Sequence, residues 1–122
     1  MEDRRSWLRF TVQFSVKLRK LNGSSEEMEA TVVDVSFRGI GIETNQELQP
    51  GTEISIEWPD PPFYFSGEAI ANGTVVNVKN EKGKIGHFRL SVMFSDSESE
   101  LAQSMVSWAQ NQSRGQKRVS YY

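Results

Sequence analysis

The sequence predicts a mainly β domain, either a small closed barrel or a sandwich, that ends in one C-terminal helix. Apolar and polar residues alternate with a period of two in several segments, most clearly over 10–19 and 88–94. Short segments that contain glycine, proline or asparagine separate these strands. After Phe94 the apolar residues recur at helical spacing instead. These observations favour regularly spaced antiparallel strands followed by a helix.

The composition limits the class of protein. The chain has 122 residues, which suits one domain that buries a core without disulfide or metal support. It contains no cysteine, so disulfide bonds and thiolate metal sites are excluded. No apolar run is long enough to span a bilayer and no secretory signal is visible, so we expect a soluble cytoplasmic protein. The formal net charge of -2 disfavours a general nucleic-acid binder, because such proteins are usually basic.

Three strands are predicted in the N-terminal part of the chain. Residues 1–9 are polar and basic, and we interpret them as a flexible arm. A strand over 10–19 follows, with apolar residues at every second position. The Asn-Gly-Ser-Ser sequence at 22–25 favours a turn, and a second strand covers 28–36. A short third strand contains the apolar residues at 40–42.

Three more strands are predicted before the helix. The first covers 54–58, where apolar and polar residues alternate again. The segment 63–79 is predicted as one long strand that bends near Gly67 or Gly73, because glycines inside strands often indicate bends or bulges. The last strand covers 88–94. With the strands before them, these make about six, connected by short turns.

The helix after the last strand has one apolar face. Leu101, Met105 and Trp108 recur at positions i, i+4 and i+7, so they lie on the same side of a helix. This face needs a surface to pack on, either the end of the barrel or a partner. We therefore assign 10–112 to the folded domain. Residues 113–122 have no periodicity and are predicted to form a disordered tail.

The sequence does not contain a recognisable catalytic or metal site. Its one histidine, His87, falls on the strand face opposite Phe88 and Leu90, which is the solvent face. A solvated histidine without a neighbouring nucleophile does not make a catalytic pair, and the scattered carboxylates lack metal-ligand spacing. No glycine-rich phosphate-binding motif is present. The sequence thus predicts a binding protein that is not an enzyme and that has no metal or cofactor.

Two polar side chains interrupt the end of the second strand. Side chains alternate between the two faces of a strand, so Asp34 and Ser36 project from one face while Val33 and Val35 project from the other. Gly39 follows, and glycine permits either a positive φ or the close approach of another group. We interpret this segment as a platform that offers an acceptor and a hydroxyl group to a ligand.

A cluster of arginines precedes the first strand. Arg4, Arg5 and Arg9 carry guanidinium groups, which bind phosphates through two hydrogen bonds and stack on planar rings. Alone, such a cluster is an ordinary basic tail. In an antiparallel pair, however, the start of the first strand and the end of the second lie at the same end of the sheet. The arm can therefore fold over the platform formed by Asp34 and Ser36.

The two segments together resemble the two-part motif of the PilZ domain, a family of bacterial receptors for the second messenger cyclic di-GMP. The family pattern is Arg-x-x-x-Arg, a gap, and then Asp/Asn-x-Ser-x-x-Gly. Here Arg5-Ser-Trp-Leu-Arg9 matches the first part, and Asp34-Val-Ser36-Phe-Arg-Gly39 matches the second. The resemblance extends over the chain apart from the last few residues. It implies an all-β fold, namely a six-stranded antiparallel β-barrel of the split-barrel type, with one C-terminal α-helix.

The resemblance also implies a role for each motif residue in binding cyclic di-GMP. Arg5 and Arg9 would contact its phosphates and guanine faces. Asp34 and Ser36 would hydrogen-bond a guanine edge, because a carboxylate accepts from N–H and amino donors. Gly39 would let the strand approach the base. In PilZ domains, an additional arginine directly before the first motif arginine goes with binding of two intercalated ligand molecules. Arg4 holds that position here, so the resemblance implies an intercalated dimer of the ligand.

The expected function is a cyclic di-GMP receptor that orders its arm around the ligand and signals to a downstream protein partner. The alternative is a PilZ-like protein–protein adaptor with weak or no nucleotide binding. Four aromatic residues are either its contact points or ordinary residues of the core and the tail: Phe63, Tyr64, Tyr121 and Tyr122. A small RNA- or DNA-binding barrel is a third interpretation, which the slightly acidic balance disfavours.

Overall fold

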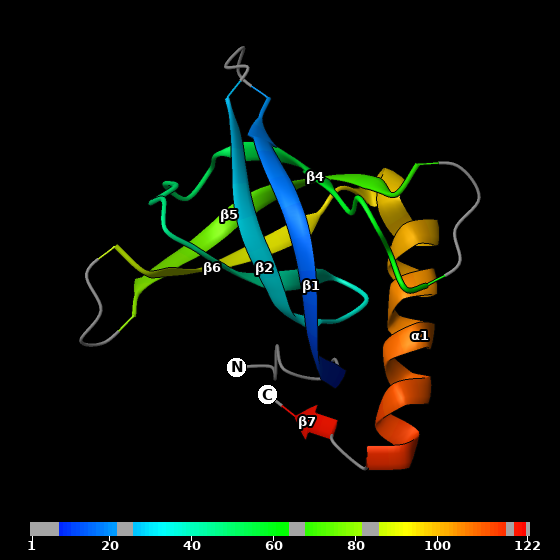
Figure 1. Cartoon of the computed structure of the whole chain (residues 1–122). Coiled ribbons are helices and arrows are strands. Elements are labelled where there is room, and N and C mark those ends of the chain that lie inside the picture. The colour runs from blue at the N-terminus through cyan, green and yellow to red at the C-terminus, as the bar shows by residue number, and fades with distance from the viewer. Residues whose placement is uncertain (1–7, 22–25, 64–67, 82–85, 117–118, 122) are drawn as a thin grey trace, which may run out of the picture.

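The protein is represented by a computed structural model that describes residues 8–21, 26–63, 68–81, 86–116 and 119–121 (Figure 1). The elements in chain order are the strands β1 to β6, a 3-10 turn, the helix α1 and the short strand β7. Their bounds are β1 Leu8–Lys20, β2 Glu27–Val35, β3 Gly39–Thr44, β4 Glu53–Glu57, β5 Ile70–Asn80, β6 Phe88–Phe94, the 3-10 turn Asp96–Glu98, α1 Ser99–Gln116 and β7 Val119–Tyr121.

The strands form a closed antiparallel barrel. Their order is β2-β3-β6-β5-β4-β1, and β1 also pairs with β2, which closes the circle of six strands. Every pairing is antiparallel. Of the two architectures that alternation alone allowed, the barrel is therefore the correct one. The prediction of a six-stranded barrel with a C-terminal helix is confirmed.

The strand predicted over 63–79 is shorter in the structure. β5 begins at Ile70, and the chain before it returns beside the end of β4, where the Trp58 amide donates to the Ala69 carbonyl at 2.9 Å. The expected bend at Gly67 lies outside the described residues. Of the two interpretations of Phe63, the core residue is the correct one, since Phe63 is buried and packs edge-on to Phe14, with ring centroids 5.8 Å apart.

The core fills the barrel and continues under α1. Every strand of the barrel and the helix contribute fully buried side chains: Leu18, Val32, Ile42, Ile54, Val75, Leu90 and Met105. The burial of one such side chain contributes about 1.5–3 kcal/mol to folding. The predicted helix face packs on this barrel, since Leu101 and Met105 are buried and Trp108 lies 5.4 Å from the ring of Phe14. Among the described residues, no helix is long and apolar enough to cross a membrane.

The C-terminal segment differs from the predicted disordered tail over 113–122. α1 continues to Gln116, and β7 then pairs with the first residues of β1 (Figure 1). Phe10 pairs with Val35 of β2 on one side and with Val119 of β7 on the other. The physical reason is the edge of β1: β4 pairs only with its C-terminal part, so backbone groups near Phe10 remain available to another strand.

Candidate functional site

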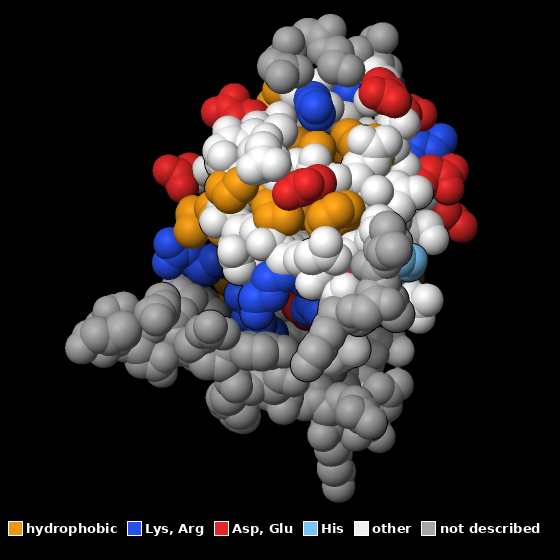
Figure 2. Space-filling model, turned by 90° about the vertical axis from the view of Figure 1, so that its left-hand side faces the viewer, with side chains coloured by type: hydrophobic (Ala, Val, Ile, Leu, Met, Phe, Trp, Pro, Cys, Tyr) orange, Lys and Arg blue, Asp and Glu red, His pale blue; other side chains and the backbone are white. Residues whose placement is uncertain are grey.

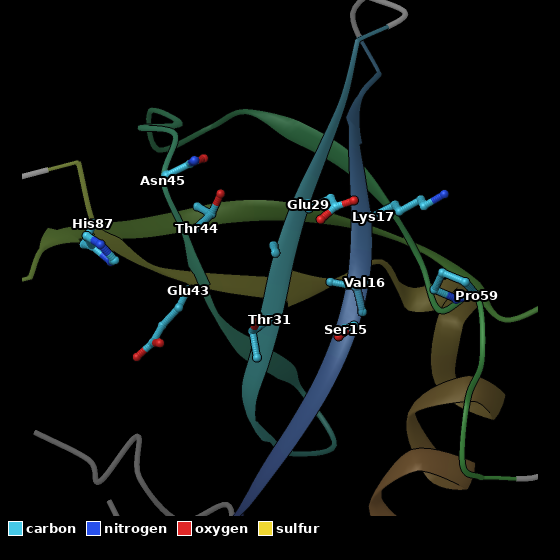
Figure 3. Close-up of a pocket in the computed structure, with 11 residues that line it drawn as sticks. Ser15, Val16, Lys17, Glu29, Thr31, Glu43, Thr44, Asn45, Pro59 and His87 are labelled. Carbon is cyan, nitrogen blue, oxygen red and sulfur yellow. The ribbon is translucent and has the colours of Figure 1, made fainter.

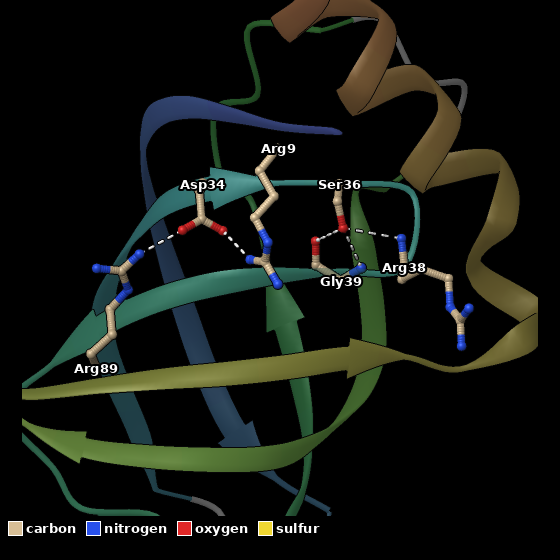
Figure 4. A network of polar contacts seen from close by, with 6 residues as sticks. All are labelled: Arg9, Asp34, Ser36, Arg38, Gly39 and Arg89. Carbon is tan, nitrogen blue, oxygen red and sulfur yellow. Dashed lines mark hydrogen bonds and ion pairs between the residues drawn. The ribbon is translucent and has the colours of Figure 1, made fainter. Parts of the chain in front are cut away.

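Asp34 of β2 is the centre of a polar network on the barrel (Figure 4). Its Oδ1 accepts a hydrogen bond from Nη1 of Arg9 at 2.9 Å, and its Oδ2 accepts one from Nη2 of Arg89 at 2.5 Å. The Asp34 side chain is 7% exposed, whereas those of Arg9 and Arg89 are 31% and 37% exposed. A buried carboxylate thus joins two partly exposed guanidinium groups, and the three side chains together carry an excess of positive charge.

A β-bulge at Val33 turns Asp34 to the outside of the barrel. Between Val32 and Asp34, β2 advances by two residues while its partner β3 advances by one. Val32 and Val35 are both fully buried as a result. Strict alternation from Val32 would instead point Asp34 into the core. Our expectation that Val33 and Val35 share a face was therefore wrong, and the bulge is the reason.

Gly41 makes room for the carboxylate. It lies opposite Asp34 in the pairing of β2 with β3. A Cβ atom at Gly41 would lie 2.8 Å from Oδ2 of Asp34, which is closer than real Cβ atoms approach other atoms, and 3.0 Å from Oδ1, which is tighter than most real contacts. The sequence analysis did not find this residue. The available signal was a glycine between Ile40 and Ile42 in a predicted strand, since such glycines often indicate close approach of another group.

Ser36 shapes the turn between β2 and β3 and does not present its hydroxyl group on an outer face. Its side chain is buried, and its Oγ accepts hydrogen bonds from the amides of Arg38 and Gly39, both at 3.2 Å. The same hydroxyl donates to the Gly39 carbonyl at 3.2 Å (Figure 4). β2 already ends at Val35, so alternation no longer applies to Ser36. The predicted platform of Asp34 and Ser36 is corrected accordingly.

Gly39 is required for strand packing. A Cβ atom there would lie 2.0 Å from the carbonyl oxygen of Val92 in β6. Gly39 does not have the positive φ that would otherwise explain a glycine. Of the two expected reasons for this glycine, close approach is the correct one, and the approaching group in this structure is the backbone of β6.

The sequence of residues 3–110 matches the family model of the PilZ domain. The chain belongs to the PilZ domain family. The resemblance inferred from the two-part motif is thereby confirmed. A comparison with curated proteins gives no significant match.

Solved structures of two PilZ domains and of an inhibitor of motility share the fold at low sequence identity. The PilZ domain with c-di-GMP of YcgR from Escherichia coli is 19% identical, with a TM-score of 0.68 over 94% of this chain and 98% of that one. The Bacillus subtilis inhibitor of motility MotI/DgrA is 14% identical, with a TM-score of 0.72 over 93% of this chain and 53% of that one. The PilZ domain of CeSA from a cellulose-synthesizing bacterium is 15% identical, with a TM-score of 0.54 over 84% and 95%.

The structure brings together part of the PilZ motif. Arg9 lies within β1, where we expected it at the end of the flexible arm over 1–9, and its backbone pairs with Ser120 of β7. Arg9 contacts Asp34, and the turn built by Ser36 and Gly39 follows directly after β2. The other two predicted ligand-binding residues lie outside the described part of the chain: Arg4 and Arg5.

The structure adds Arg89 to this PilZ site. Arg89 is separated from Asp34 by 55 residues, and β6 brings it there because β6 pairs with β3. Alternation with Leu90 predicted that Arg89 faces outward, but nothing in the sequence indicates its partner. A contact between strands that are distant in the sequence depends on the order of the strands around the barrel, and the alternation of apolar and polar residues does not predict that order.

A separate hollow of about 430 Å³ lies along β1, β2 and β3 (Figure 3). Its lining includes Lys17, Glu29, Glu43 and His87, and the Asp34 network is not among the described residues that line it. The two carboxylates make it unfavourable for an anionic ligand. No group of three His, Cys, Asp or Glu side chains in the described part of the chain could hold a metal ion. We therefore place the candidate site of this PilZ domain at Asp34.

Proposed function

We propose that this PilZ domain is a receptor that binds cyclic di-GMP at the Asp34 network. The observation that carries the proposal is the buried Asp34 carboxylate at the acceptor position of the motif, with an arginine on each oxygen. The proposal is supported by the PilZ domain of YcgR, which has the same fold and was solved with c-di-GMP.

The chemistry of the network suits both parts of this ligand. Guanine offers ring N–H and amino donors along one edge, and a carboxylate oxygen is an acceptor for them. A guanidinium group binds phosphate through charge-assisted hydrogen bonds and stacks on flat rings. Two arginines and one aspartate leave an excess of positive charge for an anionic ligand. Figure 2 shows Lys and Arg side chains gathered on the lower part of one face of the molecule.

Binding exchanges the partners of Arg9 in this proposal. Arg9 Nη1 contacts Asp34 Oδ1 at 2.9 Å on a side chain that is only 7% exposed, so guanine reaches that oxygen in this proposal by displacing Arg9. Arg9 then turns to a ligand phosphate, and Arg5 joins it as the N-terminal arm becomes ordered around the ligand. Ser36 contributes by holding the turn after β2, because its hydroxyl group already has three partners within that turn.

Stoichiometry and signalling complete the proposal. Arg4 precedes the first motif arginine, and we assign it to an intercalated dimer of cyclic di-GMP. The ordered arm and the ligand create a surface that a downstream protein partner reads. The domain acts as a binding switch and not as an enzyme.

A protein–protein adaptor is the second candidate, and exposed apolar side chains favour it. Val76 of β5 and Met93 of β6 are 48% and 44% exposed. Figure 2 shows a group of hydrophobic side chains above the Lys and Arg side chains. Of the aromatic contacts first considered for this function, Phe63 is in the core, Tyr64 and Tyr122 lie outside the described residues, and Tyr121 belongs to β7.

Isothermal titration calorimetry of the chain with cyclic di-GMP separates the two functions. The receptor function predicts saturable binding at micromolar ligand, with two ligand molecules per chain if the dimer forms. The adaptor function predicts no heat of binding at tens of micromolar ligand. GMP serves as the control ligand, because it offers one guanine and one phosphate but not the cyclic dinucleotide.

A further inference from the structure

Arg89 belongs to the candidate site although it lies outside the two-part motif. Its Nη2 donates to Oδ2 of Asp34 at 2.5 Å, which is the oxygen that Arg9 does not contact. A carboxylate that is 7% exposed needs partners for both oxygens, because an unpaired buried charge is strongly unfavourable. Arg89 therefore supplies the hydrogen-bond donor for one of the two carboxylate oxygens of Asp34.

The two arginines are anchored differently. Arg89 is the second residue of β6, but its backbone is paired on both sides, with Glu43 of β3 and with Lys79 of β5. Arg9 lies close to the start of β1, beyond the last pair that β1 makes with β2, and its backbone pairs with Ser120 of β7. A strand segment that is paired on one side opens more easily than one that is paired on both sides. Arg89 is thus the fixed partner of Asp34, and Arg9 is the partner that can leave.

We propose that Arg89 is a positioning residue for ligand binding, which rests on the proposed function. It holds Oδ2 of Asp34 and compensates the carboxylate charge while Arg9 exchanges Oδ1 for a ligand phosphate. Without Arg89, the departure of Arg9 would leave a buried carboxylate without its described partners. The exchange would then be unfavourable, and Asp34 would also lose the contact that orients its free oxygen toward guanine.

The test is calorimetric titration of Arg89→Gln with cyclic di-GMP, together with thermal unfolding of the free protein. We expect the affinity to fall by roughly ten- to hundred-fold, as for the loss of a hydrogen bond between charged groups. Arg19→Gln is the matched control, because Arg19 makes a similar pair with Glu27 at 2.7 Å near the other end of β1. Its affinity should stay within about two-fold of the unsubstituted chain, since that pair is exposed.

A double-mutant cycle with Asp34→Asn distinguishes positioning from direct contact with the ligand. If Arg89 acts through Asp34, then Arg89→Gln should weaken binding much less in the Asp34→Asn background than in the unsubstituted chain. An equal loss in both backgrounds would mean that Arg89 binds the ligand itself, and it would overturn the proposal. If Arg89→Gln does not fold, Arg89→Lys replaces it. Lysine keeps the charge but not the guanidinium geometry, so we expect an intermediate loss.

The outcomes separate this inference from the function on which it rests. Normal binding by Arg89→Gln, alongside binding by the unsubstituted chain, would overturn the role of Arg89 alone. Absence of binding by the unsubstituted chain would contradict the proposed function and overturn the role of Arg89 with it. Three results together would support the proposal. Arg89→Gln should bind weakly, Arg89→Lys should restore part of the affinity, and Arg89→Gln should have little further effect in the Asp34→Asn background.

Discussion

Gly41 of β3 lies directly opposite Asp34 of β2, and the carboxylate occupies the space that a side chain at Gly41 would fill. The distance from a Cβ atom at Gly41 to Oδ2 of Asp34 would be 2.8 Å. The glycine is therefore part of the carboxylate's surroundings without offering any polar group of its own. Its effect on binding is exerted through the position of Asp34.

Gly41→Ala is expected to displace the Asp34 side chain. The added methyl group forces the carboxylate away from Arg9 or Arg89, so the affinity for cyclic di-GMP should fall by at least roughly ten-fold. The free energy of unfolding should fall by about 1–3 kcal/mol, as for other overpacked sites. Calorimetry and urea unfolding measure the two effects. Unchanged affinity in a folded Gly41→Ala protein would contradict the role of this glycine.

Ser36→Ala is expected to act mainly on stability. The substitution removes a buried hydroxyl group that accepts from two amides and donates to the Gly39 carbonyl, so the Gly39 amide loses a buried hydrogen bond and the Arg38 amide a partly buried one. The expected loss is about 1–3 kcal/mol in the free energy of unfolding, measured by urea titration. Ser15→Ala is the control, because Ser15 is an exposed serine of β1. A Ser36→Ala protein as stable as this control would contradict the structural role.

Arg9→Ala and Arg5→Ala should differ in their effect on the free protein. Both should weaken cyclic di-GMP binding by roughly ten- to hundred-fold, because each removes charged hydrogen bonds to the ligand. Arg9→Ala should also lower the free energy of unfolding by about 1–2 kcal/mol, because it leaves Asp34 Oδ1 without its arginine. Arg5→Ala should leave it nearly unchanged. Equal thermal stability of the two variants would count against the Arg9–Asp34 pair.

Deletion of residues 117–122 should loosen the start of β1. β7 pairs with Leu8–Phe10, so its removal leaves the backbone groups of these residues without that strand. Amide hydrogen exchange over 8–10 should become at least roughly ten-fold faster, while the centre of β6 keeps its protection. Cyclic di-GMP binding should weaken by a few-fold, because Arg9 lies in the loosened segment. Unaltered exchange over 8–10 would show that β7 does not hold β1.

Much of the fold could be predicted because alternation is a local property. The strand around Leu90 and the helix face of Leu101 and Met105 follow directly from it. The bulge at Val33 could not be predicted in this way, because two adjacent valines give no signal of which one is extra. The pairing of β7 with β1 was also missed, because it depends on which backbone groups the finished barrel leaves available.

The candidate site likewise contains residues that the sequence predicted and residues that it did not. Arg9, Asp34, Ser36 and Gly39 were found because their spacing matches a family motif. The motif did not say how Ser36 is used, since its three hydrogen bonds lie within the turn. Arg89 could not be found, because its contact with Asp34 joins strands that are far apart in the sequence.

Calorimetric titration with cyclic di-GMP, comparing the unsubstituted chain with Asp34→Ala, tests the central claim most directly. Asp34 accepts hydrogen bonds from Arg9 and Arg89 and is the proposed acceptor for guanine, so its removal should weaken binding by roughly a hundred-fold or more. We predict saturable micromolar binding by the unsubstituted chain and its near loss in Asp34→Ala. The absence of binding by the unsubstituted chain, or equal binding by both proteins, would contradict the claim.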